Sequence, residues 1–477
     1  MPKVTNPSQQ SEASARLASV RQRIVGIDVE VPLLDGAKRT YIFFDNAAST
    51  PILREVLDTV NKFMPWYSSV HRGSGFKSQI ATQAYEDARR VVGEFFGASK
   101  NDHVVIFGKN TTEAINKLSY RLSLSKKDVV LISLLEHHSN DLPWRQTAEV
   151  HHIKVDSTGN LVEKDLDRLL AKFQGRVKLV AISGGSNVTG NMPDIHAIAA
   201  KAHAAGAQIA VDCAQLAPHR QVKMGDLNDP EHLDYITVSA HKLYAPFGTG
   251  ALIGRRDTFE RGVPELCGGG TIDVVTTDRV EWTAPPDRDE AGSPNVVGAI
   301  AMAKSLKILA GISMSEISAH ETELTRYTLR KLSSVKGVTI LGDADPRQAA
   351  SRLGVIPFRV RGMHNGLVAA ILSTEWGIGV RNGCFCAHPY VTHLLEVSEA
   401  GLEKFREEVL AGDRRHMPGV VRVSFGMYNT KEEVDVLAEA LSCIASGNYQ
   451  GAYRQEKTTG DYAAVGWEPN LEKYFTL

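Results

Sequence analysis

Short apolar runs alternate with stretches of helical periodicity along the first 310 residues of the chain. The runs lie at 41–44, 103–107, 129–134, 151–155, 178–182, 208–211 and 235–238. Between them, helical spacing or helix-start signals occur at 79–96, 108–116, 161–173 and 194–205. Strands that alternate with helices over connections of this length are typical of parallel pairing. The pattern therefore predicts an α/β fold in which helices flank a mostly parallel sheet.

A long helical stretch at 311–335 introduces a second pattern. Beyond it, apolar runs at 338–341, 354–360, 378–381 and 420–425 accompany helical segments at 364–373 and 431–444. This arrangement predicts a smaller α+β domain. We expect four units, which are an N-terminal segment that packs with the smaller domain (1–40), a large α/β domain (41–310), the α+β domain (311–450) and a C-terminal tail (451–477). Trp467 and Tyr474 would dock the tail.

Composition narrows the classes of protein to consider. With 477 residues, 43% of them hydrophobic, the chain can bury a large core. Its net charge of −1 gives no attraction to nucleic acid or to an anionic membrane. No apolar run approaches the roughly 20 residues that span a bilayer, and the polar N-terminus has no signal core, so we expect a cytoplasmic protein. The five cysteines are too few and too scattered for a disulfide framework, which leaves a cysteine available for chemistry.

The segment Ser-Ala-His-Lys at 239–242 carries the strongest chemical signal. Lys242 closely follows the apolar run 235–238, with Ser239 three residues and His241 one residue before it. A lysine that forms a Schiff base needs a desolvated amine and neighbours that hold a charged cofactor. A surface lysine in a loop is the simpler interpretation of this residue alone. The residues at other strand ends favour the cofactor site.

Polar residues follow several other predicted strands, where open parallel sheets bind their ligands. Thr111 and Thr112 open a helix, whose free N–H groups can hold a phosphate. His137 suits stacking on a flat cofactor, and Asn187 can reach a ring oxygen or a substrate carboxylate. Asp212 ends an apolar run, where a carboxylate needs a positive partner such as a pyridinium nitrogen. Each residue alone fits a turn or a helix cap, but their joint occurrence with the lysine favours a binding site.

These segments, in this order, resemble pyridoxal 5'-phosphate (PLP) enzymes of fold type I, in the class V aminotransferase group. Within that group the chain is most similar to SufS-type cysteine desulfurases and selenocysteine lyases. The similarity covers about residues 20–450, through segments at 45–49, 70–73, 111–113, 136–138, 186–187, 212–215, 239–242, 268–271, 291–295, 381–389 and 422–429. It implies the PLP-dependent transferase fold, with a mostly parallel seven-stranded sheet and a smaller α+β domain.

The resemblance also implies roles for individual residues. Lys242, Cys386 and His137 would be catalytic, with Lys242 joined to PLP. The other cofactor-binding residues would be Thr111, Thr112, Asp212, Gln215, Ser239, His241 and Thr271, the last from the neighbouring subunit of a homodimer. The substrate-binding residues would be Asn187, Arg422, Arg381 and His71, because the forked guanidinium of Arg422 suits a carboxylate. No metal ligand is expected.

Cys386 decides the predicted reaction. In the desulfurases, a loop cysteine between Arg-x-Gly and Ala-x-Pro attacks the substrate sulfur, so that alanine leaves and a persulfide stays on the enzyme. The segment 381–389 places Cys386 at this position. The resemblance therefore implies L-cysteine as the substrate, L-alanine as the product and an acceptor protein for the sulfur. Selenocysteine lyase activity is compatible with the same residues.

Other hypotheses remain open, because Gly-Cys-Phe-Cys at 383–386 departs from the SufS pattern of two histidines at 384 and 385. This loop resembles that of molybdenum cofactor sulfurases, which use the same desulfurase chemistry. A second hypothesis is another class V enzyme (an aminotransferase, epimerase or C–S lyase) in which Cys386 is incidental. A third is a metal knuckle of Cys384, Cys386 and His388 on a scaffold without cofactor, although a structural zinc site needs four ligands. Cys384 by itself is typical of a small buried residue.

Overall fold

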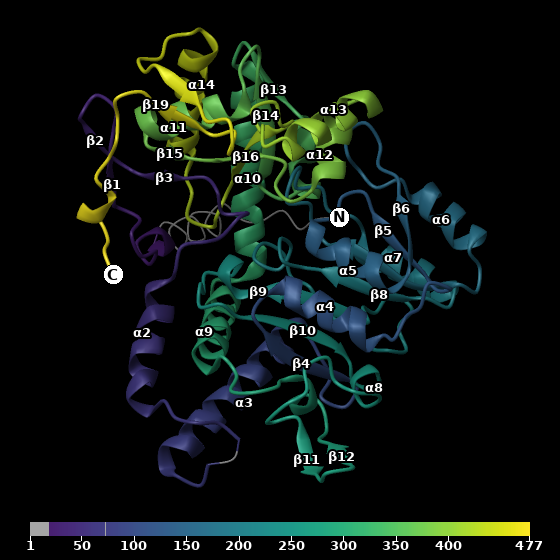
Figure 1. The fold of residues 1–477 in the computed structure, drawn as a ribbon. Helices are drawn as coiled ribbons and strands as arrows, with labels where there is room; N and C mark the ends of the chain where they lie inside the picture. Colours follow the sequence, from purple (N-terminus) through teal and green to yellow (C-terminus); the bar gives the residue numbers. More distant parts are fainter. Residues whose placement is uncertain (1–18, 72) are drawn as a thin grey trace, which may run out of the picture.

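A seven-stranded sheet forms the centre of the computed structural model, which describes residues 19–71 and 73–477 (Figure 1). The strand order is β4-β10-β9-β8-β7-β5-β6. The strands are β4 (His103–Gly108), β5 (Val129–Ser133), β6 (Glu149–Ile153), β7 (Val177–Ser183), β8 (Gln208–Asp212), β9 (Tyr235–Ser239) and β10 (Gly250–Arg255). β10 pairs antiparallel with β4 and β9, whereas the other strands run parallel. The predicted α/β fold with a mostly parallel sheet is confirmed.

Alternate residues of each central strand face two different cores. In β5, Val129 and Leu131 enter a core that also holds side chains of α2, α3, α6, α7 and α9. Val130 and Ile132 enter the opposite core, with α4, α5 and α8. The helices are α2 (Arg54–Phe63), α3 (Phe76–Phe96), α4 (Thr111–Arg121), α5 (Leu142–Thr147), α6 (Glu163–Lys172), α7 (Ile195–Ala204), α8 (Arg256–Phe259) and α9 (Val296–Ile312). Because both faces are covered, the strands are continuous apolar runs, which is why the sequence pattern located them.

β10 is a central strand that the apolar pattern does not predict. Glycines at 250 and 254 interrupt its apolar residues. Gly250 is required by a close approach, since a Cβ atom there would lie 2.6 Å from the Cα of Asn110. The missing side chain thus lets the sheet pack directly against the start of α4.

A second sheet with its own core lies above the first in Figure 1. Its antiparallel order is β13-β14-β17-β16, from β13 (Val338–Ile340), β14 (Val355–Val360), β16 (Arg381–Gly383) and β17 (Val420–Ser424). Its core includes α10 (Met314–Ser334), α11 (Asn365–Trp376) and α14 (Lys431–Ala445). The predicted strand at 41–44 becomes β3 (Ile42–Phe43), which pairs with β15 (Ile378–Gly379) rather than with the central sheet. The division into four units stays a prediction.

Shorter elements complete the fold. They are the hairpins β1 (Glu30–Pro32) with β2 (Lys38–Thr40), β11 (Ile272–Val275) with β12 (Val280–Trp282) and β18 (Tyr453–Gln455) with β19 (Tyr462–Ala464), and the helices α12 (His388–Leu394) and α13 (Glu399–Leu410). The C-terminal hairpin is anchored by Tyr453, whose hydroxyl donates to Glu375 at 2.7 Å. Tyr474, expected to dock the tail, is 54% exposed.

No single helix among residues 19–71 and 73–477 has both the length and the apolar composition to cross a membrane. Only α9 and α10 taken together meet that test, and the chain bends by 76° between them. Ser313, at the bend, has a φ of 87°. The long helical stretch predicted at 311–335 therefore begins only after this break. The cytoplasmic location stays a prediction.

A buried ion network joins α10 to the segment that follows β8. The Glu321 carboxylate of α10 accepts hydrogen bonds from the Arg220 guanidinium and, at 2.8 Å, from the Gly354 N–H. It also lies 3.0 Å from the Nδ1 atom of His219. Burial by itself raises the pKa of Glu321, but these partners outweigh it and lower the pKa to about 2. The charged carboxylate therefore stabilises the packing of α10.

Replacing this carboxylate tests the network. We expect Glu321→Gln to lower the free energy of unfolding by about 3–5 kcal/mol at pH 7, since the substitution leaves a largely buried guanidinium unpaired. Because the pKa of Glu321 is lower in the folded chain than the ordinary 4.5, the contribution is complete above that value and is lost as the pH falls towards 2. Urea unfolding should show that the difference in free energy of unfolding between wild type and variant decreases from pH 7 to pH 3.

Glu323→Gln is the matched control on the same helix. Glu323 is 50% exposed and pairs with Lys431, so its loss should change the free energy of unfolding by less than about 1 kcal/mol. Equal losses in the two variants would contradict the proposed importance of the buried network.

Candidate active site

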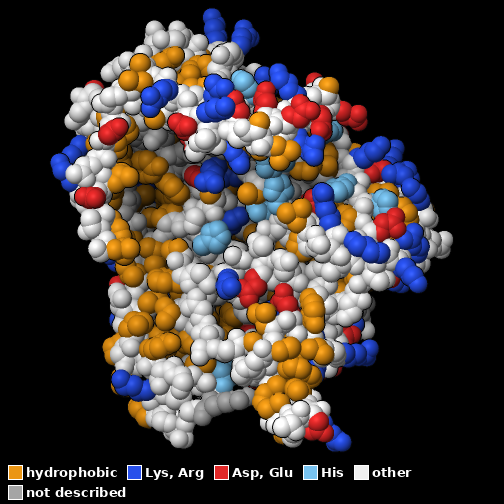
Figure 2. Space-filling model, in the orientation of Figure 1, with side chains coloured by type: hydrophobic (Ala, Val, Ile, Leu, Met, Phe, Trp, Pro, Cys, Tyr) orange, Lys and Arg blue, Asp and Glu red, His pale blue; other side chains and the backbone are white. Residues whose placement is uncertain are grey.

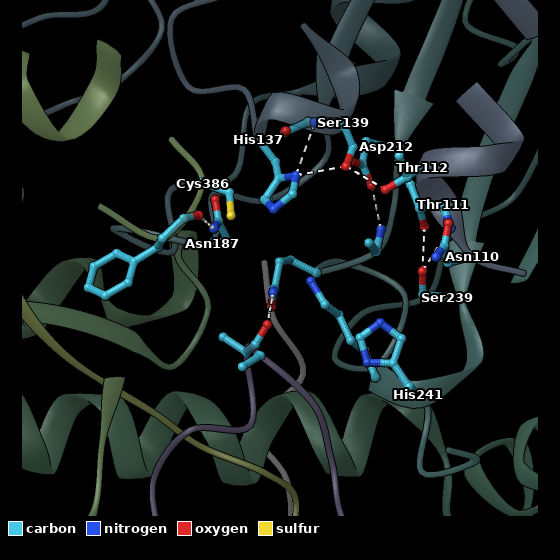
Figure 3. A pocket seen from close by; sticks show the side chains of 18 of the residues that line it. Asn110, Thr111, Thr112, His137, Ser139, Asn187, Asp212, Ser239, His241 and Cys386 are labelled. Atoms are coloured by element: carbon cyan, nitrogen blue, oxygen red, sulfur yellow. Dashed lines mark hydrogen bonds between the residues drawn. The ribbon is translucent and has the colours of Figure 1, made fainter. Parts of the chain in front are cut away.

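A cavity of about 280 Å³ lies at the carboxyl ends of the central strands. Figure 2 shows it as a hollow bordered by histidine and basic side chains, and Figure 3 shows its lining. The lining includes the predicted residues Thr111, Thr112, His137, Asn187, Asp212, Gln215, Ser239, His241, Lys242, Arg381, Cys386 and Arg422. Parallel strands end at the same edge of a sheet, so residues far apart in the sequence meet there.

Lys242 lies in the cavity just after the end of β9. The strand ends at Ser239, and a single 3₁₀ turn (Ala240–Lys242) follows it. Removal of water from the amine lowers the pKa of Lys242 to about 8, with Arg422 acting in the same direction and Asp212 against it. An amine with this pKa is partly unprotonated near neutral pH, which is the state that attacks an aldehyde.

The start of α4 provides hydroxyl and amide groups on one side of the cavity (Figure 3). Asn110 caps the helix with its side chain. The Ser239 hydroxyl accepts a hydrogen bond from the Thr111 N–H at 2.8 Å and lies 2.9 Å from the Thr111 hydroxyl. The hydroxyls of Thr112 and Ser139 lie 2.7 Å apart. Hydroxyl groups beside the first amides of a helix suit an anionic group such as a phosphate.

Asp212 places a buried carboxylate at the end of β8. Its side chain is 7% exposed and accepts a hydrogen bond from the Ala214 N–H at 2.9 Å. Burial raises the pKa of Asp212. No cationic side chain in the described part of the chain forms an ion pair with this carboxylate. A buried carboxylate is costly without a cation, so the position suits the positive end of a ligand.

His137 follows β5, and its ring points into the cavity (Figure 3). The Ser139 N–H donates to its Nδ1 atom at 3.1 Å, so the neutral ring carries its hydrogen on Nε2. Burial, and then the charge of Lys242, lower the pKa of His137 to about 4. The same two causes lower the pKa of His241 to about 4. Both rings are therefore neutral at pH 7.

Arg422 of β17 stands directly opposite Arg381 of β16. Asp45 relieves their repulsion, with its carboxylate 2.6 Å from Arg422 and 3.8 Å from Arg381. Arg422 also donates to the carbonyl oxygen of Asn187 at 2.8 Å and lies 4.6 Å from the ring of Phe385. Within the described structure, its buried Nε–H has no hydrogen-bond partner. A fixed guanidinium with a spare donor suits a carboxylate ligand.

The loop between β16 and α12 places Cys386 at the cavity, where it is exposed. Phe385 and Cys386 have φ angles of 52° and 54°, in a region that residues other than glycine rarely adopt. The Asn187 side chain donates to the Phe385 carbonyl oxygen at 2.7 Å. The His138 N–H donates to the Cys386 carbonyl oxygen, also at 2.7 Å. These contacts hold the strained turn, so that the thiol faces the cavity that Lys242 enters.

His388 fixes the far side of the same loop against His138. Their rings stack with centroids 4.9 Å apart and planes 6° from parallel. The backbone N–H of His388 donates to the Nε2 atom of His138 at 3.3 Å, and the Nδ1 atom of His388 lies 3.1 Å from the same nitrogen. Burial lowers the pKa of both histidines, and the acceptor role of Nε2 requires that His138 be neutral.

Two predicted site residues lie outside this cavity. Thr271 is fully buried, and its hydroxyl donates to the carbonyl oxygen of Gly268 at 2.8 Å. His71 is exposed, with its ring against Tyr85. Arg72, which belongs to the same predicted segment as His71, lies outside the described residues. The roles given to Thr271 and His71 stay predictions.

Comparisons with known proteins place the chain in a family. The family described as aminotransferase class-V matches residues 42–437. The chain belongs to the class V aminotransferase family. The cysteine desulfurase of Haloferax volcanii is 32% identical over 432 residues, which cover 88% of this chain and 94% of that protein.

Solved structures of cysteine desulfurases share the fold of this class V protein. The apo structure from Thermococcus onnurineus NA1 has a TM-score of 0.77 at 29% identity and covers 94% of this chain and 100% of its own. CsdA from Escherichia coli, solved as an S-sulfonic acid, has a TM-score of 0.71 at 27% identity, with the same coverage of both chains. The predicted family and fold type I are confirmed, and enzymes of this family depend on PLP.

Several residues of this class V site were not assigned a role from the sequence. Asp45 begins a segment used for the resemblance, but only the folded chain shows that it separates two arginines. His138 and Ser139 are the two residues after His137, and this adjacency is the signal that places them near the site. The contact between His138 and His388 spans 250 positions, and no sequence signal announces it. Gln215 does line the cavity, while its side-chain amide donates to the carbonyl oxygen of Ala47.

His388→Ala tests how the Cys386 loop is held. The variant removes the ring that stacks on His138, so we expect the loop to open more often. Amide hydrogen exchange in peptides that cover 384–388 should become roughly tenfold faster, as expected for a segment with fewer buried contacts. His393→Ala is the control on the same helix, since its ring makes only a 3.3 Å contact with Asp156. Unchanged exchange in His388→Ala would show that the stacked pair does not hold the loop.

Proposed function

We propose that this protein is a PLP-dependent cysteine desulfurase that converts L-cysteine to L-alanine and receives the sulfur on Cys386 as a persulfide. The observation that carries the proposal is that Cys386 and Lys242 line one cavity although they follow strands of two different sheets, β16 and β9. The names of the relatives support the same activity. Selenocysteine would fit the same chemistry, because selenium replaces only the atom that is transferred.

The lining of the cavity fits PLP. Thr111, Thr112, Ser239 and His241 would hold the phosphate, Asp212 the ring nitrogen, Gln215 the ring oxygen, His137 the ring face and Lys242 the aldehyde. The buried carboxylate of Asp212 supports this fit, because it forms no ion pair with any described residue and a pyridinium would supply one. When bound, PLP stabilises the negative charge that develops at the substrate Cα and Cβ atoms.

Arg422 and Asn187 would bind the substrate. The unpaired Nε–H of Arg422 is available to a carboxylate, while Asp45, the Asn187 carbonyl oxygen and the Phe385 ring keep the guanidinium in place. A carboxylate bound here would share the cavity with Cys386, which lines it as well. A bidentate or stacked guanidinium cannot be replaced by an ammonium group without loss.

Two side chains would handle protons. The Lys242 amine, with a pKa of about 8, can accept and return a proton near neutral pH. The neutral ring of His137 can donate from Nε2, because Ser139 occupies its Nδ1 atom. Both groups are desolvated, which strengthens their interactions with the reacting atoms.

Cys386 would complete the reaction by nucleophilic attack on the substrate sulfur. The Cβ–S bond of the substrate breaks and an S–S bond to Cys386 forms, and the carbon takes up a proton to become the methyl group of alanine. The net change is cysteine plus thiol to alanine plus persulfide, so atoms and electrons balance. The thiol is exposed, which also lets an acceptor protein collect the sulfur.

We further infer a homodimer, with Thr271 and His71 acting near the cavity of the neighbouring subunit. The exposed apolar residues Trp66, Phe76 and Val275 support an interface on this part of the surface, since monomers rarely expose such side chains together. They are 45%, 71% and 59% exposed. A cytoplasmic location remains part of this proposal.

Cys386→Ala tests the proposed reaction. We expect the variant to keep the yellow colour of bound PLP and the borohydride-reducible bond to Lys242. Alanine release from L-cysteine should fall by about 100-fold or more, as happens when a nucleophile is removed. In the wild type without reductant, mass spectrometry should find an added sulfur on Cys386. Cys267→Ala is the control, because this thiol is also exposed but lies outside the cavity.

The products separate the proposal from its alternatives. Equimolar alanine and sulfide in the presence of reductant support a desulfurase. Pyruvate with ammonia would indicate a C–S lyase, and undiminished alanine release by Cys386→Ala would show that this thiol is incidental. A colourless, zinc-containing preparation without a borohydride-tagged Lys242 peptide would contradict PLP chemistry altogether.

A further inference from the structure

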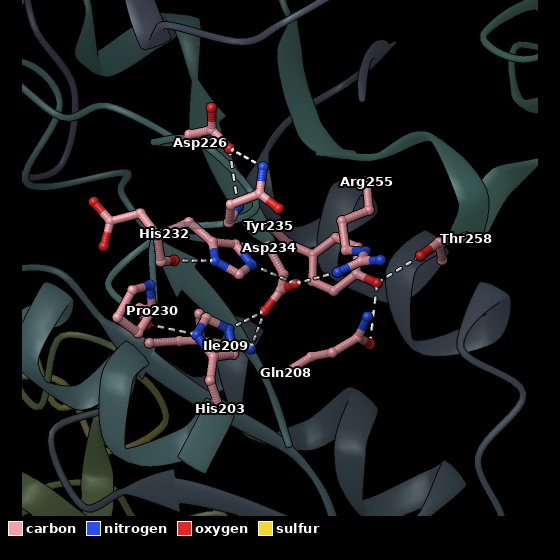
Figure 4. A network of polar contacts seen from close by, with 12 residues as sticks. His203, Gln208, Ile209, Asp226, Pro230, His232, Asp234, Tyr235, Arg255 and Thr258 are labelled. Carbon is pink, nitrogen blue, oxygen red and sulfur yellow. Dashed lines mark hydrogen bonds and ion pairs between the residues drawn. The ribbon is translucent and has the colours of Figure 1, made fainter. Parts of the chain in front are cut away.

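Three metal-ligating side chains meet at the edge of the central sheet that is opposite to the active-site cavity. Asp234 directly precedes β9, whose other end leads to Lys242. His232 lies two residues earlier, and His203 belongs to α7 (Figure 4). The exposed fractions of their side chains are 1% for Asp234, 8% for His232 and 17% for His203. His232 and Asp234 are close in the sequence, and only the fold brings His203 to them.

Both imidazole rings direct their Nε2 atoms at the same carboxylate. The Nε2 atom of His203 lies 2.9 Å from one oxygen of Asp234, and that of His232 lies 3.3 Å from the other. The rings themselves stack, with centroids 4.1 Å apart and planes 15° from parallel. One ligand atom from each of the three side chains therefore lies within 4.8 Å of the other two.

Backbone carbonyl groups determine which ring nitrogen carries hydrogen. The Nδ1 atom of His203 lies 2.7 Å from the carbonyl oxygen of Pro230, and that of His232 lies 2.6 Å from the carbonyl oxygen of Asp229. A carbonyl oxygen only accepts, so each Nδ1 atom must be the donor. In a neutral ring, the Nε2 atom then has only its lone pair to present.

In its neutral form this arrangement leaves the two Nε2 lone pairs without a hydrogen-bond donor among the described residues. Any neutral ring directs a nitrogen lone pair at a carboxylate oxygen. The guanidinium of Arg255 lies 3.3 Å from the same carboxylate and forms an ion pair with it. A metal ion between the Nε2 atoms and the carboxylate would turn the contacts between lone pairs and carboxylate into metal–ligand bonds.

We propose that His203, His232 and Asp234 bind a divalent transition-metal ion, with zinc the best match. Imidazole nitrogen and carboxylate oxygen are usual zinc ligands, and a water molecule would complete four-coordination. Ligands about 2.0–2.1 Å from a tetrahedral ion lie roughly 3.3 Å apart, close to the separations of 2.9 and 3.3 Å between these atoms.

The outer contacts of the three side chains are those that metal sites use. Histidine ligands usually donate their second N–H to a carbonyl group, which orients the ring. His203 and His232 both do so, to Pro230 and Asp229. The carboxylate of Asp234 is held by the Ile209 N–H at 2.8 Å. The site would thus connect α7 with the starts of β8 and β9.

Zinc at this site would be structural, because the active-site cavity lies at the other end of β9. The proposal is independent of the desulfurase activity, and its readouts are metal binding and thermal unfolding. Holoenzyme stripped with EDTA and titrated with zinc chloride against a chromophoric chelator should bind one high-affinity zinc ion per chain. The unfolding temperature should rise on addition of zinc, because an ion that binds only the folded state stabilises it.

Variants locate the bound ion. His232→Gln and Asp234→Asn should each lower zinc affinity by more than about 100-fold, since loss of outer partners alone costs roughly 10–100-fold. His196→Gln is the matched control, because His196 is also on α7 and its Nδ1 atom contacts the carbonyl oxygen of Glu231 in a similar way. This control should keep both the affinity and the rise in unfolding temperature.

The absorption spectrum of bound cobalt(II) distinguishes this site from a site formed by cysteines. Bound at His203, His232 and Asp234, cobalt(II) should show visible d–d absorption without a thiolate charge-transfer band, and the absorption should disappear in His232→Gln. Absence of high-affinity zinc in the wild type, equal affinity in wild type and His232→Gln, or a thiolate band in the cobalt spectrum would each overturn the proposal. The wild-type titration decides even if a variant fails to fold.

Discussion

The parallel register of β5, β7, β8 and β9 is the constraint on which the cavity depends. Because these strands run in one direction, His137, Asn187, Asp212 and Lys242 emerge at the same edge of the sheet. Helices cover both faces, so a shift of one strand would disturb two hydrophobic cores together. The sheet is therefore a rigid base on which a buried amine and a buried carboxylate can be kept close to each other.

The second sheet contributes two like charges, both arginines, to the lining of the cavity. Arg381 and Arg422 stand opposite across β16 and β17, and Asp45, from a distant part of the chain, separates them. The buried pair between Asp45 and Arg422 contributes little net stability, because desolvation offsets the attraction. The proposed function of the two arginines is instead to bind an anionic ligand. The turn at Phe385 and Cys386 has an unfavourable backbone conformation. It persists because contacts from other parts of the chain stabilise it.

Much of the fold could be predicted from apolar runs, because strands covered on both faces are apolar at every position. The apolar pattern did not predict β10, because glycines interrupt its apolar residues. Gly250 is needed there for the close contact between its backbone and that of Asn110. β3 was found as a strand, but its partner β15 lies far along the chain and outside the central sheet. Pairing between segments so distant has no local signal.

The sequence by itself determined the chemistry that the chain can perform, because a lysine, an aspartate and a cysteine in family-typical segments specify donors, acceptors and a nucleophile. Only the tertiary structure decided how these groups are tuned and held. Desolvation lowers the pKa of Lys242 to about 8 and that of His137 to about 4 only when strands and loops close around them. Asp45 between two arginines, His388 on His138, and His203 beside Asp234 are likewise contacts across long sequence separations. Such contacts depend on three-dimensional packing, which local residue patterns do not encode.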